Sequence, residues 1–395
     1  MIEFDDRPTQ IGTNIKIFGV GGAGGNAINT MIENDLSGVE FLTANTDISD
    51  LVKSKAKMKL QLGKKLTRGL GTGANPDLGQ RSAEESKDEI RAHLDGADMV
   101  FIAAGMGGGT GTGAAPIIAK IARDMGILTL GIVTTPFPFE GQKRMSNAED
   151  GIHKLAEFVD TLIVIPNSKL NEIYSDLTLV EAFQKADNVL YEAAKAVSDI
   201  INVSGLVNVD FADVKTVMQN MGYALMGTGI SDGESRAVLA AKAAINNPLL
   251  SDISLQGCQS LLINITAGPD IKMNEFEEVS SVIVNETGSS ANIIMGVIID
   301  PDMIGKVSVT IIATGLKTNS DKIVDFPRVQ IPAPAAPAKT QAAKQPKVED
   351  DIEDIFRVLN INQPNNKDDN SRLSEETSRA LNPRTDLPSF LKALD

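Results

Sequence analysis

A glycine-rich loop with the sequence Gly-Gly-Gly-Thr-Gly-Thr-Gly occupies positions 107–113. Residues 97–104 before it form a short apolar run that predicts a buried strand, and residues 114–125 after it have helical periodicity, with Pro116 in the first turn. Successive N–H groups of glycines can line a hollow of anion size, and a helix N-terminus adds positive partial charge. The stretch therefore predicts a phosphate-binding loop rather than a flexible linker. We expect a positive φ at Gly109, which a branched residue would disfavour.

Two further loops are rich in glycine. Gly19, Gly21 and Gly24 satisfy the spacing G-x-G-x-x-G between a strand at 14–20 and a helix from Asn26. This spacing indicates a phosphate at a helix N-terminus, but it does not say which nucleotide. Residues 66–79 form the third loop. The polar residues Asn45, Thr46 and Asp47 follow a strand at 39–44, and they fit either a ribose or metal contact or an ordinary turn.

The order of elements up to residue 177 alternates between strand and helix. Short apolar strands end in polar loops, and this pattern is typical of a doubly wound parallel α/β sheet with its ligand across the carboxyl ends of the strands. Three glycine-rich loops would then converge on one place. The strands that we expect are 14–20, 39–44, 97–104, 127–134 and 161–165, and the main helices are 26–34, 81–94, 114–125 and a helix that ends near Phe158.

A long amphipathic helix from Leu179 to about Ile201 would span roughly 35 Å and could bridge two domains. Phe183 and Asp187 lie one turn apart near its start. Asp187 could accept two N–H bonds from a guanine edge with Phe183 against the ring, or the pair could be a solvated acid and a core aromatic. After this helix come Asn208, Asp210 and Asp213, which exceed what one helix cap needs.

A second domain of α+β type is expected over residues 204–317. We expect it to contain helices at 214–222, 233–246 and 274–284, and strands at 259–266, 291–299 and 307–314. Residues 1–13 would be an N-terminal extension, 14–177 the nucleotide domain and 178–203 the central helix.

The C-terminal residues differ in composition from the rest. Residues 318–383 are rich in Pro, Ala, Lys, Gln and Asn, which is typical of a disordered linker. Apolar residues return in the tail at 384–395, and a hydrophobic peptide on a tether is typical of a docking motif. The residues that we expect to bind a partner are Asp386, Leu387, Pro388, Phe390 and Leu391.

Composition excludes several functions for this chain of 395 residues. The net charge of −15, the absence of Trp and an aromatic content of 4% argue against a nucleic-acid partner. No apolar run is long enough for a membrane span and no secretory leader is recognisable, so we expect a cytoplasmic protein. Cys258 is the single cysteine, which we expect to be buried. His93 and His153 are isolated, so no histidine-based triad is expected.

The loop at 107–113 resembles the signature loop of tubulin-like GTPases, in the form found in the FtsZ family of bacterial cell-division GTPases. The resemblance extends over nearly all of residues 12–316 and returns in the terminal peptide. It includes the segments 21–26, 45–47, 69–76, 136–144, 186–188 and 208–213.

This resemblance implies a tubulin-like fold, GTP or GDP with Mg²⁺, and head-to-tail homopolymers at the mid-cell division site. It implies that Asn208, Asp210 and Asp213 of one subunit act on GTP held by the next, and that the tail binds membrane-anchoring and regulatory division proteins. No direct metal ligand is assigned. The implied nucleotide contacts are Gly21, Gly22, Ala23, Gly24, Gly25, Asn26, Gly107, Gly108, Gly109, Thr110, Gly111 and Thr112 for the phosphates, Glu140 and Arg144 for the ribose, and Asn167, Phe183 and Asp187 for guanine. Asn45 is a further implied nucleotide contact.

Two other functions compete with this interpretation. A dinucleotide-dependent oxidoreductase would explain Gly19, Gly21 and Gly24, but it has no role for the loop at 107–113. A scaffold that binds nucleotide without hydrolysis would need neither Asp210 nor Asp213. Without the resemblance, Glu140 and Arg144 are also explained as an ordinary surface pair one helical turn apart.

Overall fold

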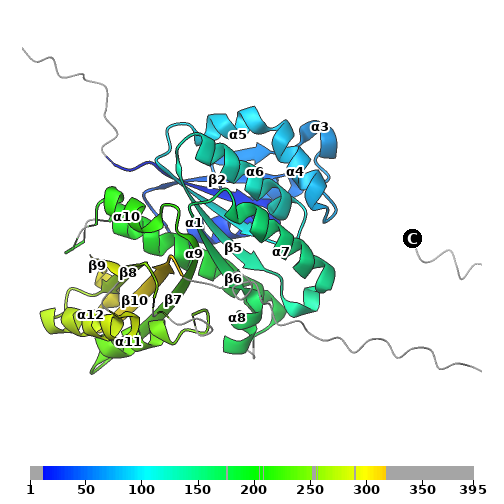
Figure 1. Cartoon of the computed structure of the whole chain (residues 1–395). Helices are drawn as coiled ribbons and strands as arrows, with labels where there is room; N and C mark the ends of the chain where they lie inside the picture. Colours follow the sequence, from blue (N-terminus) through cyan, green and yellow to red (C-terminus); the bar gives the residue numbers. More distant parts are fainter. Residues whose placement is uncertain are drawn as a thin grey trace, which may run out of the picture. The chain divides into compact units, whose positions relative to one another are not determined.

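A single sheet of ten strands runs through the part of the chain that the computed structural model describes, with the strand order β3-β2-β1-β4-β5-β6-β7-β10-β8-β9. The described residues are 12–174, 177–203, 205–207, 209–250, 255, 257–288 and 291–316. Figure 1 shows this sheet with helices around it. The strands are β1 Ile15–Val20, β2 Val39–Asn45, β3 Met58–Gln61, β4 Met99–Gly105, β5 Leu128–Thr135, β6 Thr161–Pro166, β7 Gly222–Asp232, β8 Ser260–Ala267, β9 Asn292–Ile299 and β10 Lys306–Thr314.

Twelve helices accompany these strands in the described residues. They are α1 Gly21–Glu33, α2 Ile48–Lys53, α3 Lys64–Thr67, α4 Pro76–Glu85, α5 Lys87–Leu94, α6 Thr110–Asp124, α7 Gln142–Ala156, α8 Asn167–Ile173, α9 Leu179–Asn202, α10 Phe211–Met218, α11 Arg236–Ile245 and α12 Met273–Thr287, with short 3₁₀ turns at Pro138–Glu140 and Pro301–Met303. Among them, α2, α3 and α8 were not predicted.

The first six strands are parallel, and both faces of this part of the sheet are covered. Helices α1 and α9 pack on one face, where Ile17 and Phe101 point into the core. Helices α4, α5, α6 and α7 cover the other face, against Phe18 and Ile102. Because both faces are buried, the strands are almost continuously apolar. The predicted doubly wound fold is confirmed.

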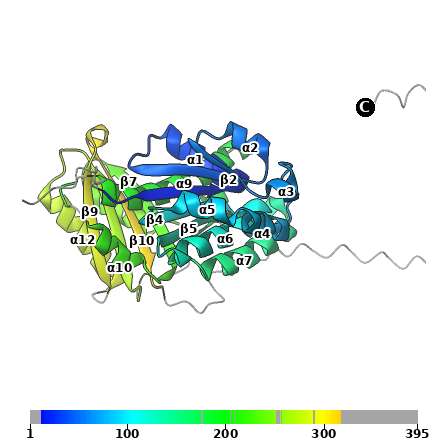
Figure 2. The same cartoon turned by 90° about the horizontal axis from the view of Figure 1, so that it is seen from above.

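Helix α9 is the central helix that the periodicity predicts. Thr178 caps its N-terminus, and Glu181 closes a capping box with the same residue. Its 24 residues correspond to about 36 Å of helix. Viewed from above in Figure 2, α9 crosses the middle of the molecule, with α2 and α3 at one end and α10 toward the other.

Strand β7 was not predicted, and it joins the parallel strands to the remaining ones. It pairs in parallel with β6 and antiparallel with β10. The sequence did not indicate a strand here because the segment contains Gly227 and Gly229, and glycine is depleted in strands. A Cβ at either position would lie 2.3 Å from a backbone oxygen of α11, so close packing of that helix requires these glycines.

Several predicted boundaries were wrong. The helix expected at 81–94 is two helices, α4 and α5, which meet at Ser86. The helix expected at 214–222 is α10, which begins earlier at Phe211 and ends at Met218. Helix α1 begins at Gly21 rather than at Asn26, so the glycines form its first turn. In the described part of the chain, no helix is both long and apolar enough to cross a membrane.

Candidate nucleotide-binding site

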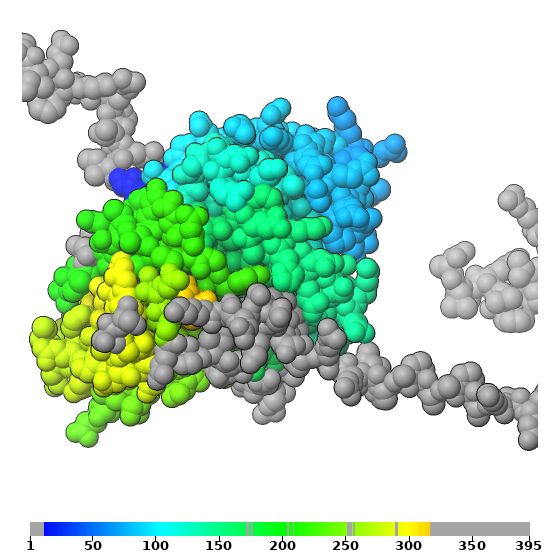
Figure 3. Space-filling model, in the orientation of Figure 1, coloured from blue at the N-terminus to red at the C-terminus, as the bar shows by residue number. Residues whose placement is uncertain are grey.

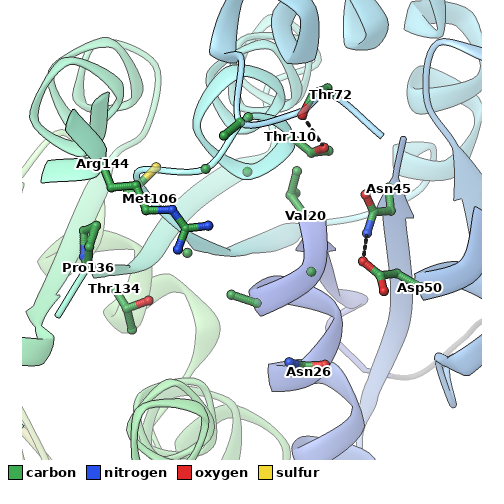
Figure 4. Close-up of a pocket in the computed structure, with 18 of the residues that line it drawn as sticks. Val20, Asn26, Asn45, Asp50, Thr72, Met106, Thr110, Thr134, Pro136 and Arg144 are labelled. Atoms are coloured by element: carbon green, nitrogen blue, oxygen red, sulfur yellow. Dashed lines mark hydrogen bonds between the residues drawn. The ribbon is translucent and has the colours of Figure 1, made fainter. Parts of the chain in front are cut away.

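A pocket of about 590 Å³ lies at the carboxyl ends of the parallel strands. The last residues of β1, β2, β4 and β5 lie in its wall, and they are Val20, Asn45, Gly105 and Thr135. Figure 4 shows how side chains from these separate loops face the same space. The predicted site residues that line it are Gly21, Gly22, Ala23, Asn26, Asn45, Gly108, Gly109, Thr110, Gly111, Glu140, Arg144, Asn167, Phe183 and Asp187.

The other four predicted glycine-loop residues lie behind this wall. A Cβ on Gly24 would lie 2.4 Å from the carbonyl oxygen of Ala103, and one on Gly25 would contact Thr43. The backbone N–H of Gly107 donates to the hydroxyl of Thr112 at 2.8 Å. The structure therefore gives Gly24, Gly25, Gly107 and Thr112 supporting positions, from which they shape the wall without lining it.

The expected positive φ at Gly109 was wrong. Its φ is −93°, whereas the left-handed conformations in this region belong to Gly21 at 74° and Gly107 at 97°. Gly109 is instead required by space, since a Cβ there would lie 2.0 Å from the hydroxyl oxygen of Thr72. The two glycine runs also touch, because a Cβ on Gly21 would lie 2.9 Å from the backbone nitrogen of Gly111.

Glu140 and Arg144 form an ion pair at the rim of the pocket. The Glu140 side chain is only 14% exposed, and its second oxygen accepts a hydrogen bond from the backbone N–H of Phe137 at 2.9 Å. Figure 4 shows the Arg144 guanidinium directed toward the space between the loops. The pair thus has a fixed orientation toward the pocket, which a solvated surface pair would not have.

The end of the pocket beside α9 combines an aromatic ring with two polar groups. Phe183 is 42% exposed, so it is not a core residue, and its ring meets that of Phe137 edge-on at 5.3 Å. Burial raises the pKa of Asp187 to about 7. Asn167 is buried and its Oδ1 has no hydrogen-bond partner among the described residues. These groups can accept N–H donors from a planar base.

Asp47, for which the sequence left a ribose or metal contact and an ordinary turn open, lines the pocket. Asp50, from the same segment after β2, was not predicted, and it accepts a hydrogen bond from Asn45 at 3.2 Å. Residues 70–74 form another part of the wall, held by a bridge between Asp47 and Leu70. These residues belong to the third glycine-rich loop, at 66–79, which was expected to converge on the same place. No local pattern distinguishes Asp50 from an ordinary helix residue.

Asp210 lies in a different hollow, which is lined by the amino ends of the same parallel strands. Asn14 and Val39, at the starts of β1 and β2, line that hollow together with Asn202 at the end of α9. Asp210 occupies the N-cap position of α10, but its side chain makes no capping bond. Asp213 is exposed in the first turn of α10, which lies at the outer surface in Figure 3.

Some predicted residues lie outside the part of the chain that the structure describes. They are Asn208, the linker at 318–383, and the tail residues Asp386, Leu387, Pro388, Phe390 and Leu391. Cys258 is buried, as predicted.

Comparisons with known proteins agree with this fold and this pocket. Residues 14–175 match the GTPase domain of the Tubulin/FtsZ family, and residues 222–317 match the C-terminal domain of the FtsZ family. The chain is 47% identical to the cell division protein FtsZ of Pseudomonas aeruginosa, over 99% of both chains. It is 51% identical to that of Coxiella burnetii, over 81% of this chain and 83% of the relative. A solved FtsZ dimer of M. jannaschii has a TM-score of 0.75 and 44% identity, over 78% of this chain and 90% of the other.

The fold and the pocket thus define a tubulin-like GTPase that binds guanine nucleotide. The chain belongs to the FtsZ family of cell-division GTPases. This result confirms the resemblance seen in the sequence, and it excludes the oxidoreductase.

Proposed function

We propose that the protein hydrolyses GTP at the junction between two subunits of a head-to-tail filament. The observation that supports this is the separation of two acidic residues. Asp187 lines the pocket at the carboxyl ends of the strands, and Asp210 lines the hollow at their amino ends. The six residues of β1 correspond to roughly 20 Å of strand between the two ends. Asp210 and Asp213 therefore cannot reach a phosphate in the pocket of their own subunit.

A contact between unlike ends of two copies would bring both halves of the site together. Such a heterologous contact leaves one free end on each side, so it propagates into a filament. Asp210 and Asp213, with Asn208, then polarise a water toward the terminal phosphate of the neighbour's GTP. The FtsZ of M. jannaschii was solved as a dimer, and self-association of this relative supports the proposal. The family's role in division supports assembly into a ring at mid-cell.

Within the pocket, each part of GTP has a matching set of groups. The glycine turns at Gly21 and Gly109 present backbone N–H groups to the phosphates. Arg144, oriented by Glu140, contacts the ribose. Asp187 and Asn167 accept the N–H donors of guanine, and the ring of Phe183 contacts the face of the base. Gly24, Gly25, Gly107 and Thr112 support the phosphate loops from behind.

A magnesium ion would bind in this pocket only if the phosphates of the nucleotide supplied part of its ligands. The described residues contain no group of three or more acidic or histidine side chains that could hold a metal alone. Asn45, Asp47 and Asp50 supply oxygen atoms on one wall, which suits an ion that keeps several waters and takes the rest of its ligands from phosphates. The bound ion would neutralise charge on the phosphates.

We propose that the chain is divided into segments with separate roles. Residues 14–177 bind GTP, residues 178–203 form the central helix, and a domain at 204–317 carries the catalytic segment. The linker at 318–383 would tether a tail that binds membrane-anchoring and regulatory division proteins from the cytoplasm. The acidic chain makes a nucleic-acid partner unfavourable.

GTP turnover measured against protein concentration tests the shared site. Turnover per subunit rises with concentration and vanishes on dilution if two subunits are required. Nucleotide binding, measured in the same dilution series, stays constant because each pocket binds GTP alone. Turnover per subunit that is unchanged down to high dilution would contradict the junction mechanism and favour a self-contained enzyme.

A further inference from the structure

Three buried threonine hydroxyls meet behind the phosphate end of the pocket. Thr46 follows β2, Thr72 belongs to the loop before α4, and Thr110 is the first residue of α6. The hydroxyl oxygens of Thr46 and Thr110 are 2.7 Å apart, and those of Thr72 and Thr110 are 3.4 Å apart. Figure 4 shows the second of these contacts. Three segments that are distant in sequence are thus joined by one short chain of hydroxyls.

The backbone of Thr46 holds the same region in a second way. Its carbonyl oxygen accepts hydrogen bonds from the Thr67 hydroxyl at 3.2 Å and from the Gly71 N–H at 3.3 Å. Thr46 is fully buried and does not line the pocket, whereas Thr72 and Thr110 do. One buried residue therefore contacts both the loop at 67–72 and the start of α6.

The loop at 67–74 needs such support because its backbone is strained. Arg68 has a φ of 53° and Ala74 a φ of 60°, both in the left-handed region that disfavours side chains. Strained backbone of this kind persists where surrounding contacts determine it. The approach to α6 is also close, since even one Cβ on Gly109 would overlap the Thr72 hydroxyl.

We propose that Thr46 is a positioning residue that fixes the two walls of the phosphate pocket relative to each other. A hydroxyl has one hydrogen to donate. When Thr46 donates to Thr110, the hydrogen of Thr110 is free for a phosphate oxygen, and the loop at 67–72 stays closed against α6. This inference rests on the proposed function, because it assumes that the phosphates of GTP occupy this end of the pocket.

Thr46→Val removes the hydroxyl at nearly constant volume and tests the proposal in the full-length chain. We expect it to weaken binding of GTP and GDP about five- to tenfold, the loss expected for one buried hydrogen bond. Guanosine has the base and ribose but no phosphate, so its affinity, measured by competition with labelled GTP, stays unchanged. Thr46→Ser keeps the hydroxyl and restores GTP affinity.

Thr43→Val is a matched control on the adjacent strand β2. The Thr43 hydroxyl forms a buried contact of 2.8 Å with that of Ser54, and neither residue lines the pocket. This variant loses stability without losing nucleotide affinity. A Thr46→Val variant that lowers guanosine and GTP affinity equally, or that lowers neither, would overturn the positioning role. Wild-type protein that fails to bind GTP would instead overturn the proposed function.

A double-mutant cycle of Thr46 and Thr72 tests whether the two hydroxyls act together on GTP affinity. Thr46 and Thr72 meet only through Thr110 in this hydroxyl chain, so Thr46→Val and Thr72→Val are expected to be non-additive in GTP affinity. Strictly additive losses would overturn the chain. If Thr46→Val does not fold, Thr46→Ala, which also removes the hydroxyl of a residue that does not line the pocket, takes its place in the same measurements. A loss confined to GTP and GDP supports the proposal, and an equal loss for guanosine overturns it.

Discussion

Asp187 and Asp210 lie at opposite ends of the same parallel strands. Asp187 belongs to helix α9, and Asp210 follows the end of that helix in the sequence. Asp187 is near the start of α9, and the helix carries the chain about 22 Å further before it ends at Asn202. The buried face of α9 packs on the sheet, so this separation is fixed by a rigid element. In the proposed filament, the residue that contacts the base and the residue that activates water would therefore face two different nucleotides.

The raised pKa of Asp187 predicts that GTP affinity depends on pH. Burial raises this pKa to about 7, so at pH 6 most free protein carries the neutral acid. If Asp187 accepts the two N–H donors of guanine, as we propose, it must bind as the carboxylate, and binding should release a proton. We expect GTP affinity to rise with pH, by up to tenfold per unit below pH 7, and to level off above it.

Binding measured by calorimetry in two buffers of different ionisation enthalpy checks this proton release. The same carboxyl also affects the free protein. Its pKa in the fold is higher than in the unfolded chain, so the folded state binds more protons and its stability falls as pH rises toward 7. A GTP affinity that is flat between pH 5.5 and 8 would show that Asp187 does not accept the base.

Asp187→Asn should change the preferred base rather than only weaken binding. An amide offers one acceptor and one donor, which matches the N1–H and the 2-oxo group of xanthine but not the two donors of guanine. We expect GTP affinity to fall by at least tenfold and xanthosine triphosphate affinity to rise. Competition between the two nucleotides provides the measurement. Equal losses for both would indicate a structural role for Asp187.

Gly109→Ala should destabilise the protein by steric overlap alone. The added Cβ would lie 2.0 Å from the Thr72 hydroxyl and 2.8 Å from the Asn75 backbone nitrogen, so the loop must move. Overpacking of this kind costs about 1–3 kcal/mol of unfolding free energy. A Cβ on Gly108 meets nothing within 4 Å, so Gly108→Ala should change the unfolding free energy by about 0.5 kcal/mol or less. Urea denaturation of both variants without nucleotide measures the difference, and equal destabilisation would contradict the steric explanation.

The sequence predicts the nucleotide half of the fold well because the strands and loops there can be recognised from residues that are neighbours in the chain. Strands buried on both faces are continuous apolar runs, and the glycine loops lie at their carboxyl ends, so the convergence on one pocket follows from topology. Helix α9 was predicted from its periodicity and its length. The class of protein came from the resemblance, because no physical rule assigns guanine to Asp187 from sequence alone.

What the sequence missed depends on contacts between distant segments. Strand β3 is a four-residue edge strand, and β7 contains glycines that only its packing against α11 explains. Asp50 enters the pocket because α2 folds back from β2. The role of Gly109 follows from the position of Thr72, which the glycine loop alone could not supply.

Deletion of residues 386–395 should separate assembly from recruitment. The segment lies outside the described residues, and we propose that it serves only to bind a partner. We expect purified protein without this segment to keep its GTP turnover and its filaments, measured by phosphate release and sedimentation. Recruitment to a membrane-bound division partner should be lost. Loss of turnover in the purified protein would indicate that the tail docks on the body.

Asp213→Ala tests the shared site most directly. Asp213 is exposed on α10, far from the pocket of its own subunit, so GTP binding and folding should be unchanged. A carboxylate that activates water contributes about 10²–10⁴-fold, so turnover should fall strongly while filaments persist longer than those of wild type.

Mixing this variant with wild-type protein distinguishes a shared site from a simple loss of active molecules. If the site is shared, each junction takes its pocket from one chain and its acid from the other. A variant subunit then inactivates the junction to which it contributes residue 213, but it still presents its own GTP to a wild-type neighbour. In an equal mixture that copolymerises at random, half of the junctions retain the acid, and the same half applies to the junctions in which the variant holds the GTP. GTP preloaded on variant subunits should therefore be hydrolysed only after wild-type subunits are added. Preloaded GTP that remains intact in such copolymers would refute catalysis across the junction.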